Sequence, residues 1–215
     1  MIKKIKQTTS EKILLIFILI LGLITFSSFI NIKYKCLFVK KYNPEKIVFD
    51  KPENIAILNA NCGNVIIELY PNFAPNSVKR FKMLINSGEY NNTAFHRVLK
   101  NVLVQAGDLE FGKKNNLNYA YIGTGQSKYG TINSELYSNF DFKKGSVALA
   151  RTTEKNTEDS QFFILLQDAP LFKGEYSPIG KVIYGLDVLK KIKYNEKGEY
   201  VLRPDFINNF RMLIN

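Results

Sequence analysis

An uninterrupted apolar run lies near the start of the chain: residues 13–30, ILLIFILILGLITFSSFI, carry no charge. A helix of this length covers roughly 27 Å, enough to cross the hydrocarbon core of a thin bilayer. Four lysines lie in residues 1–12, which is the layout of a signal peptide or a signal anchor. The nearest small-residue cleavage site is at 25–28, but the length of the run favours anchoring, and the polar stretch that follows disfavours a buried core helix. The pattern predicts a basic tail over 1–12 and one transmembrane signal-anchor helix over 13–30.

Residues 31–50 are polar and rich in lysine, so they are expected to form a linker. Lysines on the two sides of the apolar run nearly balance, so the positive-inside rule hardly discriminates between the two orientations. A single N-terminal hydrophobic segment most often exports the domain that follows it. We therefore expect a single-pass membrane protein whose domain, residues 51–215, faces the periplasm or another extracytoplasmic side.

The rest of the chain alternates short apolar runs with loops rich in glycine, asparagine and lysine. Residues 55–57 and 65–70 flank a Gly-containing turn, which predicts a two-stranded hairpin. After Pro75, apolar residues at helical spacing continue to Gly88 and predict an amphipathic helix. A second helix is expected over 186–192, and further strands are expected over 94–99, 102–106, 146–150, 161–166, 179–183 and 206–213. Many short strands with two helices predict a mainly β fold, a closed β-barrel with helical plugs.

The net charge of +11 is concentrated at the front of the chain, where residues 1–46 hold nine lysines against Glu11 and Glu45. The remaining residues hold 21 basic and 17 acidic side chains, so the globular part carries little excess charge. Five arginines in the whole chain are available for bidentate contacts to phosphate or guanine. We therefore expect no binding to nucleic acid.

The sequence contains few residues that could bind a metal ion or take part in redox chemistry. His96 is its one histidine and no Cys/His cluster occurs, so we expect no metal and no cofactor. Cys36 and Cys62 could form one disulfide, but the first lies beside the apolar run and the second in an expected strand, which disfavours a structural bridge. A lone histidine without a serine or cysteine partner is also a poor basis for hydrolysis. Its expected role is that of a buried framework residue whose polar atoms are satisfied.

One basic residue falls on an apolar face. In the expected strand over 94–99, the period of two places Phe95, Arg97 and Leu99 on one side. A guanidinium there must find a carboxylate or face a groove, because an unpaired buried charge is very costly. Spacing alone favours a structural ion pair over a functional arginine.

Two glutamines share strand faces with large apolar neighbours, Gln105 with Leu103 and Gln161 with Phe163. These amides could satisfy backbone groups at the ends of strands. They could also line an apolar slot for an extended peptide.

The segment AFHRVLKNVLVQAGD at 94–108 resembles the cyclophilin signature, Phe-His-Arg-Val followed by a short turn and Val-Gln-Gly-Gly-Asp. The resemblance continues in register through 87–98, 145–151, 160–166 and 179–192, and it covers essentially all of residues 54 to about 195. ALART at 148–152 and INSE at 132–135 are closer to bacterial members than to the common eukaryotic ones. The family implies a peptidyl-prolyl cis-trans isomerase with a closed, eight-stranded antiparallel β-barrel capped by two α-helices.

The resemblance also implies the roles of individual residues. Arg97 would be the catalytic residue. The other implied roles are binding of the substrate backbone by Gln105 and Gln161, a proline pocket lined by Leu103, Phe163 and Phe172, and a peptide groove bordered by Ala150 and Arg151. Val102 and Tyr176 occupy two further binding positions. At the position of Val102 the family more often has an aromatic residue, and at the position of Tyr176 many eukaryotic members have histidine. The loss of the aromatic side chain at Val102 should weaken proline binding by about 1–2 kcal/mol.

Isomerisation requires such residues because amide resonance gives rotation about the X-Pro bond a barrier of about 20 kcal/mol. A guanidinium aimed at the prolyl nitrogen would stabilise it as it becomes pyramidal, without a nucleophile, a metal or a proton transfer. The expected partners are proline-containing polypeptides and the membrane, and the expected state is a monomer. The alternative is a non-catalytic proline-peptide binding chaperone or scaffold tethered to the membrane, since Val102 and Leu171 depart from the family pattern.

Overall fold

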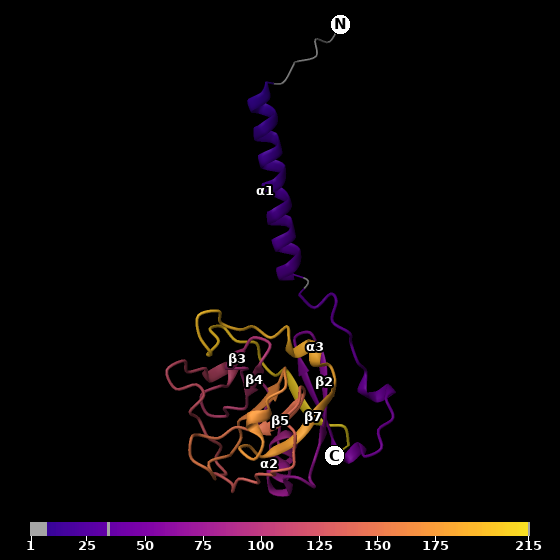
Figure 1. Ribbon diagram of the computed structural model, residues 1–215, viewed down its shortest axis with the longest axis vertical. Coiled ribbons are helices and arrows are strands. Elements are labelled where there is room, and N and C mark those ends of the chain that lie inside the picture. The colour runs from indigo at the N-terminus through magenta and orange to yellow at the C-terminus, as the bar shows by residue number, and fades with distance from the viewer. Residues whose placement is uncertain (1–7, 34, 215) are drawn as a thin grey trace. The chain divides into compact units, whose positions relative to one another are not determined.

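The computed structural model describes residues 8–33 and 35–214, which fall into two compact units, Met1–Phe38 and Val39–Asn215. The first unit contains one helix, α1 (Thr9–Lys33) (Figure 1). Within its Thr9–Ile30 stretch, an 18-residue window has a mean hydropathy of 2.9 and is 0% buried. By length and composition this helix could cross a membrane, although a signal sequence would have the same properties. Residues 1–7 of the expected basic tail lie outside the described residues.

Helix α1 begins earlier than the apolar run predicts because a capping box precedes it. The backbone N–H of Thr8 donates to a carboxylate oxygen of Glu11 at 2.8 Å, and the N–H of Glu11 returns a bond to the Thr8 hydroxyl at 3.4 Å. This reciprocal pair satisfies backbone donors at the helix start and extends the helix to Thr9.

The second unit is built on one antiparallel eight-stranded sheet. Its strands are β1 (Ile55–Ala60), β2 (Gly63–Leu69), β3 (Arg97–Leu99), β4 (Leu103–Ala106), β5 (Ser146–Leu149), β6 (Phe162–Leu165), β7 (Pro178–Tyr184) and β8 (Asn209–Met212). The order across the sheet is β3-β4-β6-β5-β7-β2-β1-β8. Strands β3 and β8 are therefore edges, and the expectation of a closed barrel is wrong: in the described residues the sheet is an open, curled half-barrel.

The segment that separates the two edges explains why the barrel stays open. Residues 199–207 run beside residues 92–98 and exchange backbone hydrogen bonds with them, but they form isolated bridges, such as Ala94 with Phe206, in place of a ladder. Arg203 has a left-handed φ of 57°, and Pro204 has no N–H to donate. The backbone is therefore too irregular here to continue the sheet from β8 to β3.

Helix α2 (Pro75–Asn86) follows its predicted pattern, with proline in the first turn and buried Val78, Phe81, Leu84 and Ile85. The ring of Phe81 lies 5.1 Å from that of Phe162 and 5.6 Å from that of Phe210, so the helix covers β6 and β8. A distant carboxylate caps its start, because Glu135 accepts the N–H groups of Asn76 and Ser77 at 3.0 and 2.7 Å. The second helix, α3 (Leu186–Leu189), is shorter than the expected 186–192.

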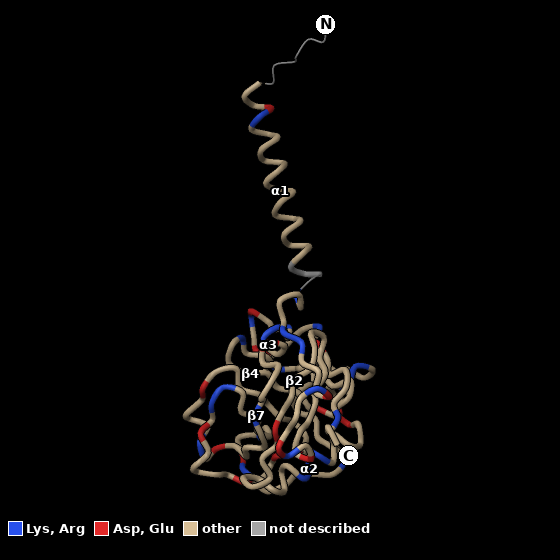
Figure 2. Tube along the Cα trace, turned by 90° about the vertical axis from the view of Figure 1, so that its right-hand side faces the viewer, with Lys and Arg blue, Asp and Glu red and all other residues tan. Residues whose placement is uncertain are grey.

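Residues 39–50, assigned to the linker from sequence, pack against the sheet unit. Val39 is buried, the Asn64 side chain donates to the carbonyl of Tyr42, and Arg211 pairs with Glu45 at 2.5 Å. The globular unit therefore begins before residue 51. Figure 2 shows basic and acidic residues interspersed over this unit, in keeping with its small excess charge.

Both cysteines of the chain are disulfide-bonded, so the expectation against a structural bridge is wrong. Cys62 lies in the turn between β1 and β2 and not within a strand, although its side chain is 4% exposed. The argument from sequence assumed that a strand position fixes the direction of the Cys62 side chain. A residue in a turn is not restricted to one face of the sheet in this way.

Candidate functional site

The register of four neighbouring strands places the expected site residues in one row. Arg97 on β3 is opposite Gln105 on β4, Gln105 is opposite Phe163 on β6, and Phe163 is opposite Ala148 on β5. Leu103 lies two residues from Gln105 and so on the same face of the sheet. The strand register therefore agrees with the alternation of side chains inferred from the sequence. The strand that carries Arg97, β3, is shorter than the expected 94–99.

A chain of side-chain hydrogen bonds follows this row. The guanidinium of Arg97 donates to Oε1 of Gln105 at 3.2 Å, and Nε2 of Gln105 donates to Oε1 of Gln161 at 3.0 Å. Nε2 of Gln161 donates to the carbonyls of Gly123 and Gly125, each at 3.0 Å. Because arginine can only donate, the first bond fixes the orientation of both amides.

Arg97 also forms an ion pair at the open edge of the sheet. Its Nε donates to Oε2 of Glu199 at 2.6 Å, and the exposed fractions are 28% for the arginine side chain and 51% for the carboxylate. These contacts use two of the five N–H donors of the guanidinium. Arg97 also lines a cavity.

That cavity has a volume of about 350 Å³ and is bounded by both expected and unexpected residues. The expected ones are Arg97, Gln105, Ala150, Arg151 and Gln161. Sequence reasoning missed the run Gly123–Gln126, together with Thr152, Thr157, Asp159, Ser160 and Tyr200. The glycines of GTGQ were an available signal for the first of these, whereas nothing near Tyr200 in the sequence points to the site.

A buried carboxylate holds the glycine run in place. Asp108 is 0% exposed, and its oxygens accept four backbone N–H groups: those of Glu110 at 3.1 Å, Phe111 at 2.8 Å, Gly123 at 2.6 Å and Gly125 at 3.2 Å. A Cβ atom at Gly125 would lie 2.2 Å from Oδ1 of Asp108, so this position requires glycine. Asp108 thereby sets where the carbonyls that bind Gln161 lie.

An apolar cluster adjoins the cavity at Ala150, which lines the cavity and packs against the cluster. The rings of Phe163, Phe172 and Tyr176 pack against one another, with centroid distances of 5.6, 5.0 and 4.8 Å. Leu103 is buried in the same cluster, and Val102 is half-buried against it. The structure therefore brings the six expected apolar residues together. Leu171 is 88% exposed and turns away from this cluster.

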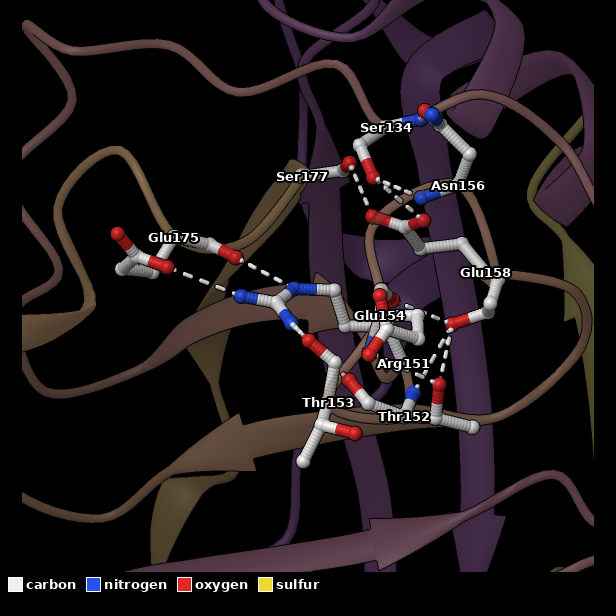
Figure 3. A network of polar contacts seen from close by, with 10 residues as sticks. Ser134, Arg151, Thr152, Thr153, Glu154, Asn156, Glu158, Glu175 and Ser177 are labelled. Atoms are coloured by element: carbon white, nitrogen blue, oxygen red, sulfur yellow. Dashed lines mark hydrogen bonds and ion pairs between the residues drawn. The ribbon is translucent and has the colours of Figure 1, made fainter.

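Arg151 borders the cavity but its guanidinium is already bonded. It donates to the carbonyls of Thr152 and Thr153 at 3.0 and 2.9 Å, and to the carbonyl and carboxylate of Glu175, both at 2.9 Å (Figure 3). Its carbon Cζ lies 5.2 Å from the ring centroid of Tyr176. Arg151 thereby links residues 152 and 153 beside the cavity to Glu175 and Tyr176 beside the apolar cluster, and it contributes to the site by positioning both segments.

A second buried carboxylate, that of Glu158, supports the loops around the cavity. Glu158 is 0% exposed and accepts the hydroxyls of Ser134 at 2.7 Å and Ser177 at 3.1 Å (Figure 3). The Ser134 hydroxyl in turn accepts the N–H of Asn156 at 2.8 Å. These bonds fix the loops around the cavity against the start of β7.

His96 lies behind the row, 1% exposed, and neither ring nitrogen has a described partner in good hydrogen-bonding geometry. Its burial agrees with the framework role expected from sequence, but the expectation that its polar atoms are satisfied is wrong. Burial lowers the pKa of His96 from 6.5 to about 4, against the opposing attraction of Asp108.

This lowered pKa predicts a stability that declines in mild acid. Between pH 6.5 and about 4 the unfolded chain binds a proton that the folded chain does not, so the free energy of unfolding falls as the pH falls, by about 3 kcal/mol over the window. Urea unfolding at pH 7 and pH 4.5 measures this change. The variant His96→Phe, which cannot titrate, is expected to lose that part of the pH dependence; an unchanged difference between the two pH values would contradict the prediction.

Among the described residues, no group of three or more His, Cys, Asp or Glu side chains is arranged to hold a metal ion. The side chains at the site offer one guanidinium, two amides and an apolar cluster.

Comparisons with known proteins agree with the fold. The family described as cyclophilin type peptidyl-prolyl cis-trans isomerase/CLD matches residues 55–212. A probable peptidyl-prolyl cis-trans isomerase of Brucella suis is 40% identical over 159 residues, covering 73% of this chain and 81% of the relative. A peptidyl-prolyl cis-trans isomerase of Acinetobacter baylyi is 36% identical over 140 residues, covering 63% of this chain and 69% of that protein.

Among solved structures, a cyclophilin type peptidyl-prolyl cis-trans isomerase of Cryptosporidium parvum, crystallised in the presence of the dipeptide Ala-Pro, superimposes with a TM-score of 0.64. It is 28% identical, and the match covers 75% of this chain and 99% of the parasite chain.

Proposed function

Since this chain belongs to the cyclophilin-type peptidyl-prolyl cis-trans isomerase family and is an isomerase of that type, we propose that Arg97 is its catalytic residue. One observation carries this proposal: Arg97 lines the cavity at the end of the row and is held there by hydrogen bonds to Gln105 and Glu199. A fixed guanidinium can act on a transition state without reorganising, which is the condition for large electrostatic stabilisation.

The proposed mechanism uses Arg97 against amide resonance. Resonance raises the barrier to rotation of an X-Pro bond to about 20 kcal/mol. As the bond twists, the prolyl nitrogen becomes pyramidal and its lone pair becomes a hydrogen-bond acceptor. An N–H of Arg97 donates to that lone pair in the twisted state and not in the planar one, so the interaction favours the transition state selectively.

The substrate is proposed to be a proline-containing polypeptide, with the prolyl ring in the cluster of Leu103, Phe163, Phe172 and Tyr176. The Cryptosporidium relative crystallised with Ala-Pro supports this choice of ligand. Val102 stands at the pocket edge as a smaller wall than an aromatic residue would be, and Phe172 packs into the same cluster. Gln105 and Gln161 are proposed to hold the substrate backbone across the cavity.

The test is a prolyl-peptide isomerisation assay on the full chain in detergent micelles, followed by protease-coupled detection or exchange NMR. Catalysed turnover is expected. If the wild-type chain binds a proline peptide but does not accelerate its isomerisation, the non-catalytic binding module is favoured instead, as the small wall at Val102 and the exposed Leu171 would allow.

We also propose that α1 anchors the chain in a membrane and that the sheet unit faces an extracytoplasmic compartment. The apolar character of Thr9–Ile30 supports the anchor. The disulfide-bonded state of Cys36 and Cys62 supports an oxidising compartment, since cytosolic thiols are kept reduced. Protease added outside spheroplasts of an expressing bacterium is expected to degrade the sheet unit; full protection, lost on lysis, would contradict this orientation.

A further inference from the structure

Two segments that are far apart in the sequence meet beside the cavity and leave large apolar side chains exposed. Residues 118–123 and 199–203 are joined by a hydrogen bond, in which the N–H of Arg203 donates to the hydroxyl of Tyr119 at 3.2 Å. They also lie close together at Gly123, where an added Cβ atom would be 2.8 Å from the ring of Tyr200. The exposed fractions are 50% for Tyr119, 49% for Tyr200 and 71% for Leu202. We call these three residues the Tyr119 patch.

The patch is continuous with the proposed substrate site because Tyr200 belongs to both. Tyr200 lines the cavity together with Arg97 and Gly123, and its backbone bridges that of Arg97. A polypeptide that places a proline in the pocket and crosses the cavity must leave over the surrounding surface. The Tyr119 patch is an apolar surface that begins at the edge of the cavity, at Tyr200.

We infer that the Tyr119 patch binds apolar and aromatic residues of the client polypeptide that flank the isomerised X-Pro bond. This inference rests on the proposed function and specifies its substrate: an unfolded segment with apolar residues near proline, in preference to a polar loop. Tyrosine suits this role because it offers a large contact area while losing little conformational entropy. Residues up to about six positions from the proline are within reach, since an extended chain covers roughly 20 Å in that length.

The inference is tested with peptides of equal length around one X-Pro bond, carrying Leu and Phe or Gly and Ser in the extension, placed before or after the proline. A short tetrapeptide serves as reference. The wild-type full chain in micelles is expected to show a KM about tenfold lower for an apolar extension on one of the two sides than for its polar counterpart. The double variant Tyr119→Ser/Leu202→Ser is expected to remove that difference while the kinetics of the tetrapeptide stay unchanged.

A matched control removes one tyrosine and one aliphatic residue elsewhere. Tyr129 and Val48 are 40% and 97% exposed and lie outside the Tyr119 patch, so Tyr129→Ser/Val48→Ser is expected to keep the preference. A thermal melt checks that both double variants fold.

The outcomes separate this inference from the proposed function. No turnover of the tetrapeptide by the wild type would overturn the proposed function. Turnover of the tetrapeptide with equal KM values for apolar and polar extensions would overturn the inference alone. Equal KM values together with binding of lipid vesicles that the Tyr119→Ser/Leu202→Ser variant loses would assign the patch to a membrane surface instead.

Discussion

Replacing Arg97 by alanine is expected to lower kcat/KM for a short X-Pro peptide by about 10²- to 10³-fold, the usual effect of removing one preorganised donor to a transition state. The loss should fall mainly on kcat, because the proposed bond forms as the prolyl nitrogen becomes pyramidal and the apolar pocket that binds the planar substrate stays intact. Arg97→Lys is expected to recover little. An ammonium cannot contact Glu199, Gln105 and the substrate at once in the fork geometry of a guanidinium.

The control for this prediction is another arginine on an edge of the same sheet. Arg211 on β8 pairs with an exposed glutamate, Glu45, and is 42% exposed, so Arg211→Ala should leave kcat/KM within about twofold of the wild type. Proline-peptide binding by the Arg97→Ala variant, measured by NMR titration, should persist. A variant that retained wild-type kcat would remove Arg97 from the mechanism and leave the cavity without its proposed electrostatic group.

The contacts of Arg97 bear on two interpretations of that residue. Its spacing favoured a structural ion pair, and its resemblance to the cyclophilin signature implied catalysis. In the structure, one edge of the guanidinium is paired with Glu199 and another part faces the cavity. The ion pair is present, and it is compatible with the proposed catalytic role because it fixes the orientation of the guanidinium. Glu199 could not be foreseen, because it lies 102 residues from Arg97 in the sequence.

The elements that sequence predicted best are those set by local pattern. Helix α2 and the hairpin of β1 and β2 follow from apolar spacing, a proline in the first turn and a glycine turn. The pairing of Arg97 with Gln105 follows once the period of two is assumed for both strands. The closed barrel failed because closure depends on residues 199–207, whose left-handed Arg203 and following Pro204 interrupt the ladder.

The loop from Glu110 to Gly130 was the least predictable part of the site. It contains one short 3₁₀ turn, Lys114–Asn116, and little apolar periodicity. Its shape is set by carboxylates outside it, Asp108 at its start and Asp159 from a distant segment, which bonds to Ser127. Local propensity carries no information about such long-range bonds, and Asp108 alone accepts four backbone N–H groups from this loop.

Asp108 therefore provides the second large expected effect. Asp108→Ala would leave four backbone N–H groups without their acceptor, those of Glu110, Phe111, Gly123 and Gly125, and is expected to lower the free energy of unfolding by about 3–5 kcal/mol. Urea unfolding measures this loss, and limited proteolysis should show new cleavage between residues 109 and 125. Asp108→Asn keeps one oxygen acceptor and should lose less. An exposed carboxylate gives the control: Asp187→Ala removes only a surface pair with Lys190 and should change stability by less than about 0.5 kcal/mol.

The substitution Asp108→Asn should also affect catalysis, through Gln161. If Asp108 sets the positions of the Gly123 and Gly125 carbonyls, then Asp108→Asn releases the amide of Gln161 and, through it, the orientation of Gln105 and Arg97. Under conditions where Asp108→Asn remains folded, kcat/KM for a short X-Pro peptide is expected to fall by about tenfold, because each link in this chain fixes the next. Unfolding stability reduced with kcat/KM unchanged would show that Asp108 supports the loop but does not position the catalytic row.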